Sequence, residues 1–126
     1  MSESILVTIK KLLGIDDSYR AFDADIIVFI NAAFMTLMQL GVGPKNGFAV
    51  HDYDTQWKHF LTNEVNLNTV QEYVYLKVKL IFDPPQNSPV LEAYKQRISE
   101  IENRLIMQAE SVEDFSFIDT ADNPRL

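Results

Sequence analysis

The sequence predicts an all-α protein, a small helical bundle of about five helices followed by an extended acidic C-terminal tail. Two observations indicate this class. Apolar residues recur at spacings of three and four residues along most of the chain, which is the period of a helix with one buried face. Glycine, proline and cap-forming polar residues fall between these stretches, where helices begin and end. We therefore expect one helical domain over residues 1–108 and a docking tail over residues 109–126.

The length and composition are those of a single globular domain. The chain has 126 residues, of which 47% are hydrophobic and 23% are charged, so it is long enough to bury one real core. It contains no cysteine, which excludes disulfides and favours a reducing cytoplasm as the place of synthesis. No signal peptide is recognisable, and no apolar run approaches the roughly 20 residues that span a bilayer. We expect a soluble protein with no membrane role.

The first helix is expected from about Ser2 to Gly14. Gly14 is suited to end it, because glycine readily adopts the left-handed conformation of a helix C-cap. Lys10 and Lys11 are expected on its solvent side. The buried face is predicted from apolar residues at i, i+4 and i+7, which are Ile5, Ile9 and Leu12.

The second helix is expected to begin at Asp23, a favourable N-cap, and to run to about Leu40 before Gly41. Phe22, before the cap, and Ile27, in the first turn, occupy the positions of a hydrophobic staple. The helix is apolar nearly all round. A helix of this kind lies at the centre of a core or is buried by neighbouring subunits.

A loop is expected over residues 41–54. Its Asn46-Gly47 pair is typical of a tight turn, and a short hairpin through residues 48–50 is one interpretation of the segment after that turn. Asp54 is then placed to cap a short helix. The apolar residues of that helix are Trp57, Phe60 and Leu61.

A longer helix is expected over residues 70–82, with Asn66 or Asn68 as its cap. It must end there, because Asp83 precedes a proline and the residue before a proline is displaced from the helical region. The pair Pro84-Pro85 therefore separates this helix from the next one.

The last helix is expected to start at Ser88, with Pro89 at its first position, where a missing N–H is harmless. Its apolar residues form one narrow stripe of about two heptads. The stripe consists of Leu91, Tyr94, Ile98, Ile101 and Leu105. Two heptads are too few for an independent coiled coil, so we expect the stripe to pack on helices of the same domain.

The segment after this helix differs in charge from the rest of the chain. Residues 109–126 contain five acidic residues and one arginine, which gives −4 of the net charge of −7. Phe115, Phe117 and Ile118 are too apolar for an idle solvated tail, and their alternation is that of an extended strand. Such a peptide can add to a sheet edge or fill grooves of a partner, oriented by acids such as Asp119. Docking onto another subunit is favoured over a frayed terminus or a tail folded back on its own domain.

No catalytic or cofactor-binding pattern is present in the sequence. His51 and His59 are eight residues apart, which fits no two-ligand helical metal motif. The glycines of residues 41–47 follow a helix, whereas a dinucleotide-binding loop follows a strand. The net charge of −7 disfavours binding to phosphate backbones. The sequence predicts a protein that is not an enzyme and holds neither metal nor cofactor.

Several stretches, read together, resemble the head-tail connector proteins of tailed bacteriophages, a family of head completion and adaptor proteins. The likeness extends over about residues 2–108, and its most specific part is residues 73–85 followed by a long amphipathic helix. The stretches are residues 9–15 (IKKLLGI), 22–27 (FDADII), 38–44 (MQLGVGP) together with Asn31, 73–85 (YVYLKVKLIFDPP) and 88–92 (SPVLE).

This resemblance implies a structural virion protein in the neck between head and tail, made in the cytoplasm of the bacterial host. It implies a homo-oligomeric, dodecameric ring beneath the portal, which extends the DNA channel and offers a platform to the tail-side neck proteins. An acidic channel lining would repel the DNA backbone, so that DNA passes without specific binding. C-terminal segments in this family commonly reach the portal, a position that fits Phe115, Phe117, Ile118 and Asp119.

A second contact surface is predicted in the loop, at Lys45, Asn46 and Phe48, toward a neighbouring subunit or the tail side. A plain surface loop is the alternative. A different class of function also stays open, namely an acidic helical regulatory or adaptor module that binds a basic partner protein. Such a module would bind one partner in a salt-sensitive way.

Overall fold

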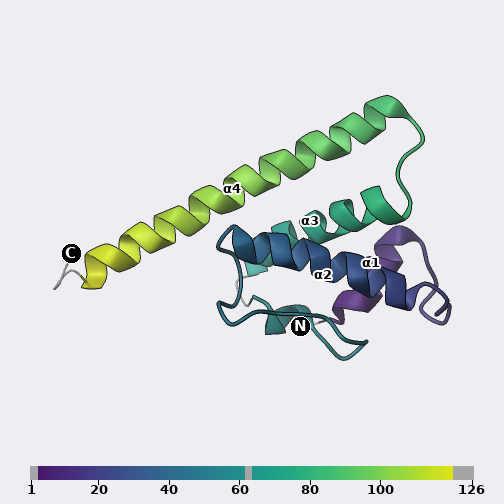
Figure 1. The fold of residues 1–126 in the computed structure, drawn as a ribbon, viewed down its shortest axis with the longest axis horizontal. Coiled ribbons are helices and arrows are strands. Elements are labelled where there is room, and N and C mark those ends of the chain that lie inside the picture. Colours follow the sequence, from purple (N-terminus) through teal and green to yellow (C-terminus); the bar gives the residue numbers. More distant parts are fainter. Residues whose placement is uncertain (1–2, 62–63, 121–126) are drawn as a thin grey trace.

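The computed structural model describes residues 3–61 and 64–120, and it describes side chains within residues 3–61 and 66–109 (Figure 1). The fold is a small helical bundle, as expected. Its helices are α1 (Ile5–Leu13), α2 (Asp23–Gln39), the 3₁₀ helix η1 (Trp57–His59), α3 (Glu64–Phe82) and α4 (Ser88–Thr120). The described part of the chain contains no strand, so the hairpin interpretation of residues 48–50 is wrong. An isolated antiparallel bridge joins Ser4 to Gln56.

The core lies around α2, which packs against α3 and α1 (Figure 1). Ile26, Ile30, Ala33, Phe34 and Leu37 are buried along α2, at the spacing of one helix face. Val28 and Met35, by contrast, are more than half exposed, at 62% and 59%. The apolar character of α2 therefore exceeds what its own bundle buries. Among the described residues no helix is both long and apolar enough to cross a membrane.

The ends of α1 are fixed by two small residues. The Ser4 hydroxyl accepts a hydrogen bond from the Val7 N–H at 3.2 Å, which makes Ser4 the N-cap. Gly14 ends the helix, as predicted, and its N–H donates to Lys11 O at 3.0 Å. The expected solvent side is correct for Lys11, which is exposed, but wrong for Lys10, which is 0% exposed.

The Lys10 ammonium is buried because oxygens from three separate segments surround it. It lies 2.9 Å from Asp23 Oδ1 and donates hydrogen bonds to the Tyr53 hydroxyl at 2.7 Å and to Tyr19 O at 2.7 Å. The Tyr53 hydroxyl in turn donates to Asp23 Oδ2 at 2.6 Å. We call Lys10, Asp23 and Tyr53 the buried ion-pair cluster. It ties α1 to the start of α2 and to the loop after α2.

The protonation states in the buried ion-pair cluster follow from its hydrogen bonds. Burial alone would lower the pKa of Lys10, but hydrogen bonds to Tyr53 and Asp23 outweigh it, so this pKa is raised. Burial alone would raise the pKa of Asp23, but hydrogen bonds from Tyr53 and Lys10 outweigh it, so this pKa is lowered. Both groups are therefore charged at neutral pH.

Asp23 is consequently not the N-cap that its sequence position suggests. It is the first residue of α2, and Phe22 occupies the cap position without a side-chain cap bond. The Asp23 carboxylate is used by Lys10 and Tyr53 instead. The Phe22 ring packs edge-to-face on Phe82 at the end of α3, with centroids 5.1 Å apart, so it joins α2 to α3.

The two long helices meet as expected, although their starts differ from the prediction. The structure has α3 beginning at Glu64 and ending at Phe82, before the prolines. The cap of α4 is Asn87, whose side-chain oxygen accepts the Val90 N–H at 3.2 Å. On the predicted stripe, Ile98, Ile101 and Leu105 are buried. The stripe thus packs within the domain, where α4 contacts α3.

The expected extended conformation of the tail is wrong for residues 109–120, because α4 continues to Thr120. The physical reason is that no glycine or proline interrupts the chain between Pro89 and Pro124, so the helix has no signal to stop. Phe115, Phe117, Ile118 and Asp119 lie on this part of α4, outside the residues whose side chains are described. The division into a domain and a docking tail stays a prediction, with its boundary at Gln108 inside α4.

We predict that Asp23→Asn destabilises the fold by about 3–5 kcal/mol, because it leaves the buried Lys10 ammonium without its counter-charge. Urea unfolding at pH 7, followed by circular dichroism, measures the loss. The double variant Lys10→Met, Asp23→Asn removes the stranded charge and should recover part of the stability. Glu92→Gln, at an exposed ion pair with Lys95, is the matched control with little effect. An equal loss in the single and double variants would contradict the role of the ion pair.

The same pair predicts how stability depends on acid pH. The folded-state pKa of Asp23 lies below its ordinary value of 3.8, so its contribution is complete above that value and is lost as pH falls through the folded-state pKa. The stability gap between the natural chain and Asp23→Asn should therefore be constant near neutral pH and narrow on acidification below about pH 4. Urea midpoints measured across a pH series check this, and a gap that widens in acid would refute it.

Candidate functional site

The loop after α2 is held against the bundle by an aromatic cluster, which we define as Phe34, Phe48, Trp57 and Phe60. The Phe34 ring on α2 lies 4.6 Å from the Phe60 ring and 5.0 Å from the Phe48 ring, between centroids. Phe48 and Phe60 also contact each other edge-to-face at 5.1 Å. The Trp57 indole N–H donates to the Thr8 hydroxyl at 3.0 Å, which adds α1 to the assembly.

Asn31 makes the polar half of this attachment. Its side-chain amide donates to Val50 O at 3.0 Å, and its side-chain oxygen accepts the Val50 N–H at 2.7 Å. Both backbone groups of Val50 are thereby satisfied by one α2 side chain. Two independent contacts, one aromatic and one polar, therefore give the loop a fixed shape beside α2.

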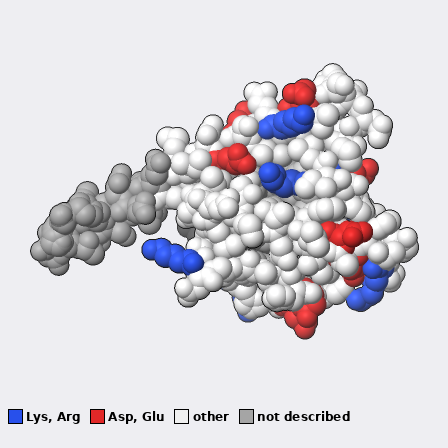
Figure 2. Space-filling view, in the orientation of Figure 1, with Lys and Arg blue, Asp and Glu red and all other residues white. Residues whose placement is uncertain are grey.

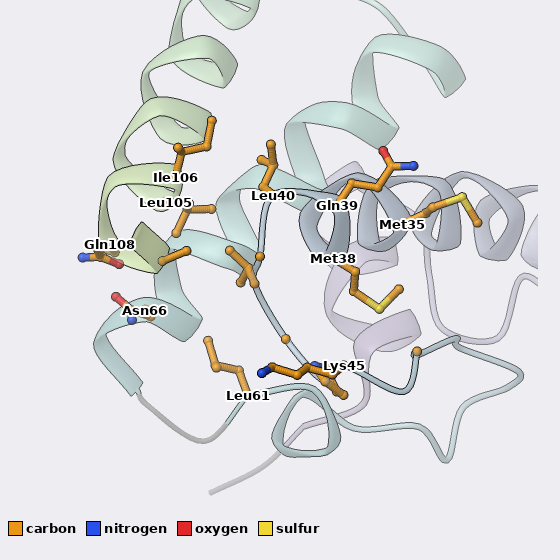
Figure 3. Close-up of a pocket in the computed structure, with 16 residues that line it drawn as sticks. Met35, Met38, Gln39, Leu40, Lys45, Leu61, Asn66, Leu105, Ile106 and Gln108 are labelled. Carbon is orange, nitrogen blue, oxygen red and sulfur yellow. The ribbon is translucent and has the colours of Figure 1, made fainter. Parts of the chain in front are cut away.

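A groove opens between the C-terminal end of α2, this loop and α4, with a volume of about 1030 Å³ (Figure 3). We call it the α2–α4 groove. Met35 and Met38 line it from α2, Leu40 from the C-cap of α2, Leu61 from the loop side, and Leu105 and Ile106 from α4. The remaining lining residues are Gln39, Gly41, Val42, Gly43, Pro44, Lys45, Gly47, Asn66, Gln108 and Ala109.

The chemistry of the α2–α4 groove is apolar with one positive charge. Among the lining residues whose side chains the structure describes, Lys45 is the only charged one. Within the described part of the chain Lys45 takes part in no ion pair. The groove is at the upper end of the size range of small-molecule pockets, and its described polar lining consists of Gln39, Lys45, Asn66 and Gln108. These properties suit an apolar peptide segment that carries negative charge.

The α4 wall of the groove is held by polar contacts with α3. Arg97 Nε donates to Glu72 Oε2 at 2.7 Å and a second guanidinium nitrogen donates to Glu72 Oε1 at 2.9 Å, while the Tyr73 hydroxyl donates to Glu102 Oε2 at 2.7 Å. The Arg97 guanidinium holds the pKa of Glu72 below its ordinary value. Burial, together with the Glu102 carboxylate, raises the pKa of Tyr73 well above its ordinary value, so this hydroxyl stays a donor.

The structure brings one part of the predicted contact surface to the α2–α4 groove. Lys45 lines it, and Asn46 is exposed in the adjacent turn, which Gly47 N–H closes by donating to Pro44 O at 3.3 Å. Phe48 is half-buried in the aromatic cluster. Sequence reasoning missed the apolar walls of the groove. The one available signal was that α2 has more apolar residues than a single bundle buries, Met35 among them.

No arrangement of catalytic or metal-binding groups accompanies the groove. His51 and His59 are both exposed, and His59 Nδ1 accepts the Gln56 N–H at 3.0 Å within the cap of η1. Among the described residues no three His, Cys, Asp or Glu side chains gather in a way that could hold a metal ion.

The chain matches the family model described as phage connector protein over residues 5–112. The chain belongs to the phage connector protein family. The match includes the bundle up to residue 112 of α4 and all the described residues that line the α2–α4 groove of this connector. Searches of curated proteins and of solved structures returned no match.

Family membership gives this connector a structural role in the phage virion, at the connection of head and tail. The family is structural and not enzymatic. Portal and tail proteins are the class of partners with which such a protein associates. The resemblance of residues 2–108 to head-tail connectors is thereby confirmed.

We predict that Gly43→Ala perturbs the groove and the fold more than Gly47→Ala. Both glycines have a positive φ, at 97° and 100°, where an alanine is strained by about 1–3 kcal/mol. A Cβ at Gly43 would also overlap the Phe60 ring, whereas a Cβ at Gly47 has nothing within 4 Å. Thermal unfolding should show the larger loss for Gly43→Ala, by about 1–3 kcal/mol for the added overlap. Equal losses would show that Phe60 moves aside freely.

Proposed function

We propose that this connector forms a homo-oligomeric ring, of twelve copies in line with the family resemblance, between the portal and the tail of a tailed phage. The ring extends the DNA channel of the portal and offers the tail-side neck proteins a platform. The observation that carries this proposal is the family match over residues 5–112, which includes α1, α2 and α3 and the part of α4 up to residue 112. The site chemistry agrees with it, since the α2–α4 groove suits a polypeptide and not a substrate.

The charge of the connector supports a channel that DNA passes without binding. The chain has a net charge of −7, so a ring of many copies is strongly acidic and repels phosphate backbones. In the face shown in Figure 2, acidic and basic side chains are interspersed between wide uncharged areas. Neutral areas of this kind are suited to contacts between subunits, while net charge acts on DNA at longer range.

Two regions are proposed to make contacts in the neck. One is the loop surface at Lys45, Asn46 and Phe48, whose shape is fixed by the aromatic cluster. The other is the end of the chain, residues 109–126, with Phe115, Phe117, Ile118 and Asp119 as its contact residues. Its partner is the portal or a neighbouring copy.

We predict that ending the chain after Gln108 leaves the bundle folded but prevents stable necks. The last buried residue of the α4 stripe, Leu105, is retained, so cooperative thermal unfolding should persist with a smaller helical signal. In phage that carry the shortened gene, electron microscopy should show filled heads that leak DNA or lack tails. A chain that ends after Thr120 is the matched control and should give normal particles.

Electron microscopy of complete necks tests the proposed function itself. A ring of this protein between portal and tail is the expected result, and its absence from complete necks, or its presence there as a monomer, would overturn the proposal. A salt-sensitive one-to-one complex with a basic partner would instead favour the acidic adaptor module. If the chain that ends after Gln108 gives normal particles, residues 109–126 have no role in assembly. The proposal of a ring would still stand in that case.

A further inference from the structure

The α2–α4 groove and the end of α4 are chemically complementary. The groove has apolar walls and one cation, Lys45. Residues 110–120 of the same chain contain four acidic residues and no basic residue, together with apolar Val112, Phe115, Phe117 and Ile118. In this sequence Val112, Phe115 and Ile118 follow one another at intervals of three, and helices with apolar residues at such spacings dock into apolar grooves.

The groove of a chain cannot receive the end of its own α4. Among the α4 residues whose side chains are described, Ala109 is the last that lines the groove, and the helix continues without interruption to Thr120. At about 1.5 Å per residue, those eleven further residues carry the backbone roughly 16 Å beyond the groove. Figure 1 shows this end of α4 projecting away from the other helices. Only a different chain can therefore place its residues 110–120 in the groove while α4 stays helical.

We propose that residues 110–120 of one connector dock into the α2–α4 groove of the next copy. This inference rests on the proposed ring and names the contact that builds it. The two surfaces are different patches of one chain, so the contact is head-to-tail, and head-to-tail contacts close into rings when the rotation between copies permits. Exposed Met35 provides a flexible apolar contact for the incoming segment, and Lys45 pairs with its acidic side chains.

Photo-cross-linking of the full-length protein tests the proposal. A photoreactive phenylalanine derivative is placed at Met35, which lines the groove, or at Val28, the matched control on the same helix. The side chains at these positions are 59% and 62% exposed, so the two positions are almost equally accessible. They differ in that Met35 lines the groove. Illumination of the concentrated purified protein and of necks isolated from phage should give a ladder of covalent multimers from the Met35 position only. Mass spectrometry should place the links within residues 110–120.

Reversing the charge of Lys45 in the groove provides a second, independent test of the docking contact. Lys45→Glu should lower the ladder yield from the Met35 position about twofold to fivefold, as loss of an exposed ion pair does. Lys11→Glu, at an exposed lysine outside the groove, should leave the yield unchanged.

Every other outcome contradicts the docking contact. Links confined to one chain, links to segments other than residues 110–120, equal ladders from both positions, or no ladder in either sample would overturn it. If the protein occupies the neck as a ring and Met35 links instead to the portal, this inference fails while the proposed function stands. Absence of the protein from the neck counts against the proposed function.

Discussion

The buried Lys10 ammonium is the constraint on which the rest of the fold depends. A charge that is fully removed from water is costly unless oxygens surround it, so the segments that supply those oxygens must converge. Asp23 brings the first turn of α2, Tyr19 brings the link between the helices, and Tyr53 brings the loop. Because α2 carries one wall of the groove and the ring of Phe34, its placement beside α1 also sets where the groove forms.

Helix ends were predictable from the sequence wherever covalent chemistry dictates them. Gly14 ends α1 and the prolines after Asp83 end α3, because these residues restrict or free the backbone whatever surrounds them. Helix starts were less predictable, since cap residues have other uses for their side chains. Asp23 is the example: its carboxylate serves a lysine thirteen positions away, a demand that no local pattern reveals. The prediction that Lys10 lies on the solvent side of α1 was wrong for the same reason.

The candidate site was only partly predictable. The turn with Lys45 follows from its Asn-Gly pair, but the groove beside it does not, because its walls join Met35 and Leu105, which are seventy positions apart in the sequence. For the end of α4, two local sequence patterns predicted different backbone conformations. A strand-like alternation of three residues predicted an extended tail, and a long stretch without glycine or proline permitted a helix. The structure has the conformation that the longer pattern permits, a helix that continues to Thr120.

The length of α4 beyond the bundle has a mechanical consequence. Leu105 is the last buried residue of its stripe, and the helix continues for fifteen residues to Thr120, about 22 Å at 1.5 Å per residue. This part of α4 therefore acts as a lever arm that pivots where α4 packs against α3. A change of about 10° in the angle between these helices would displace the far end by about 4 Å, while the residues at the pivot hardly move. Slight repacking between α3 and α4 would therefore be amplified into a displacement as large as most of a helical turn.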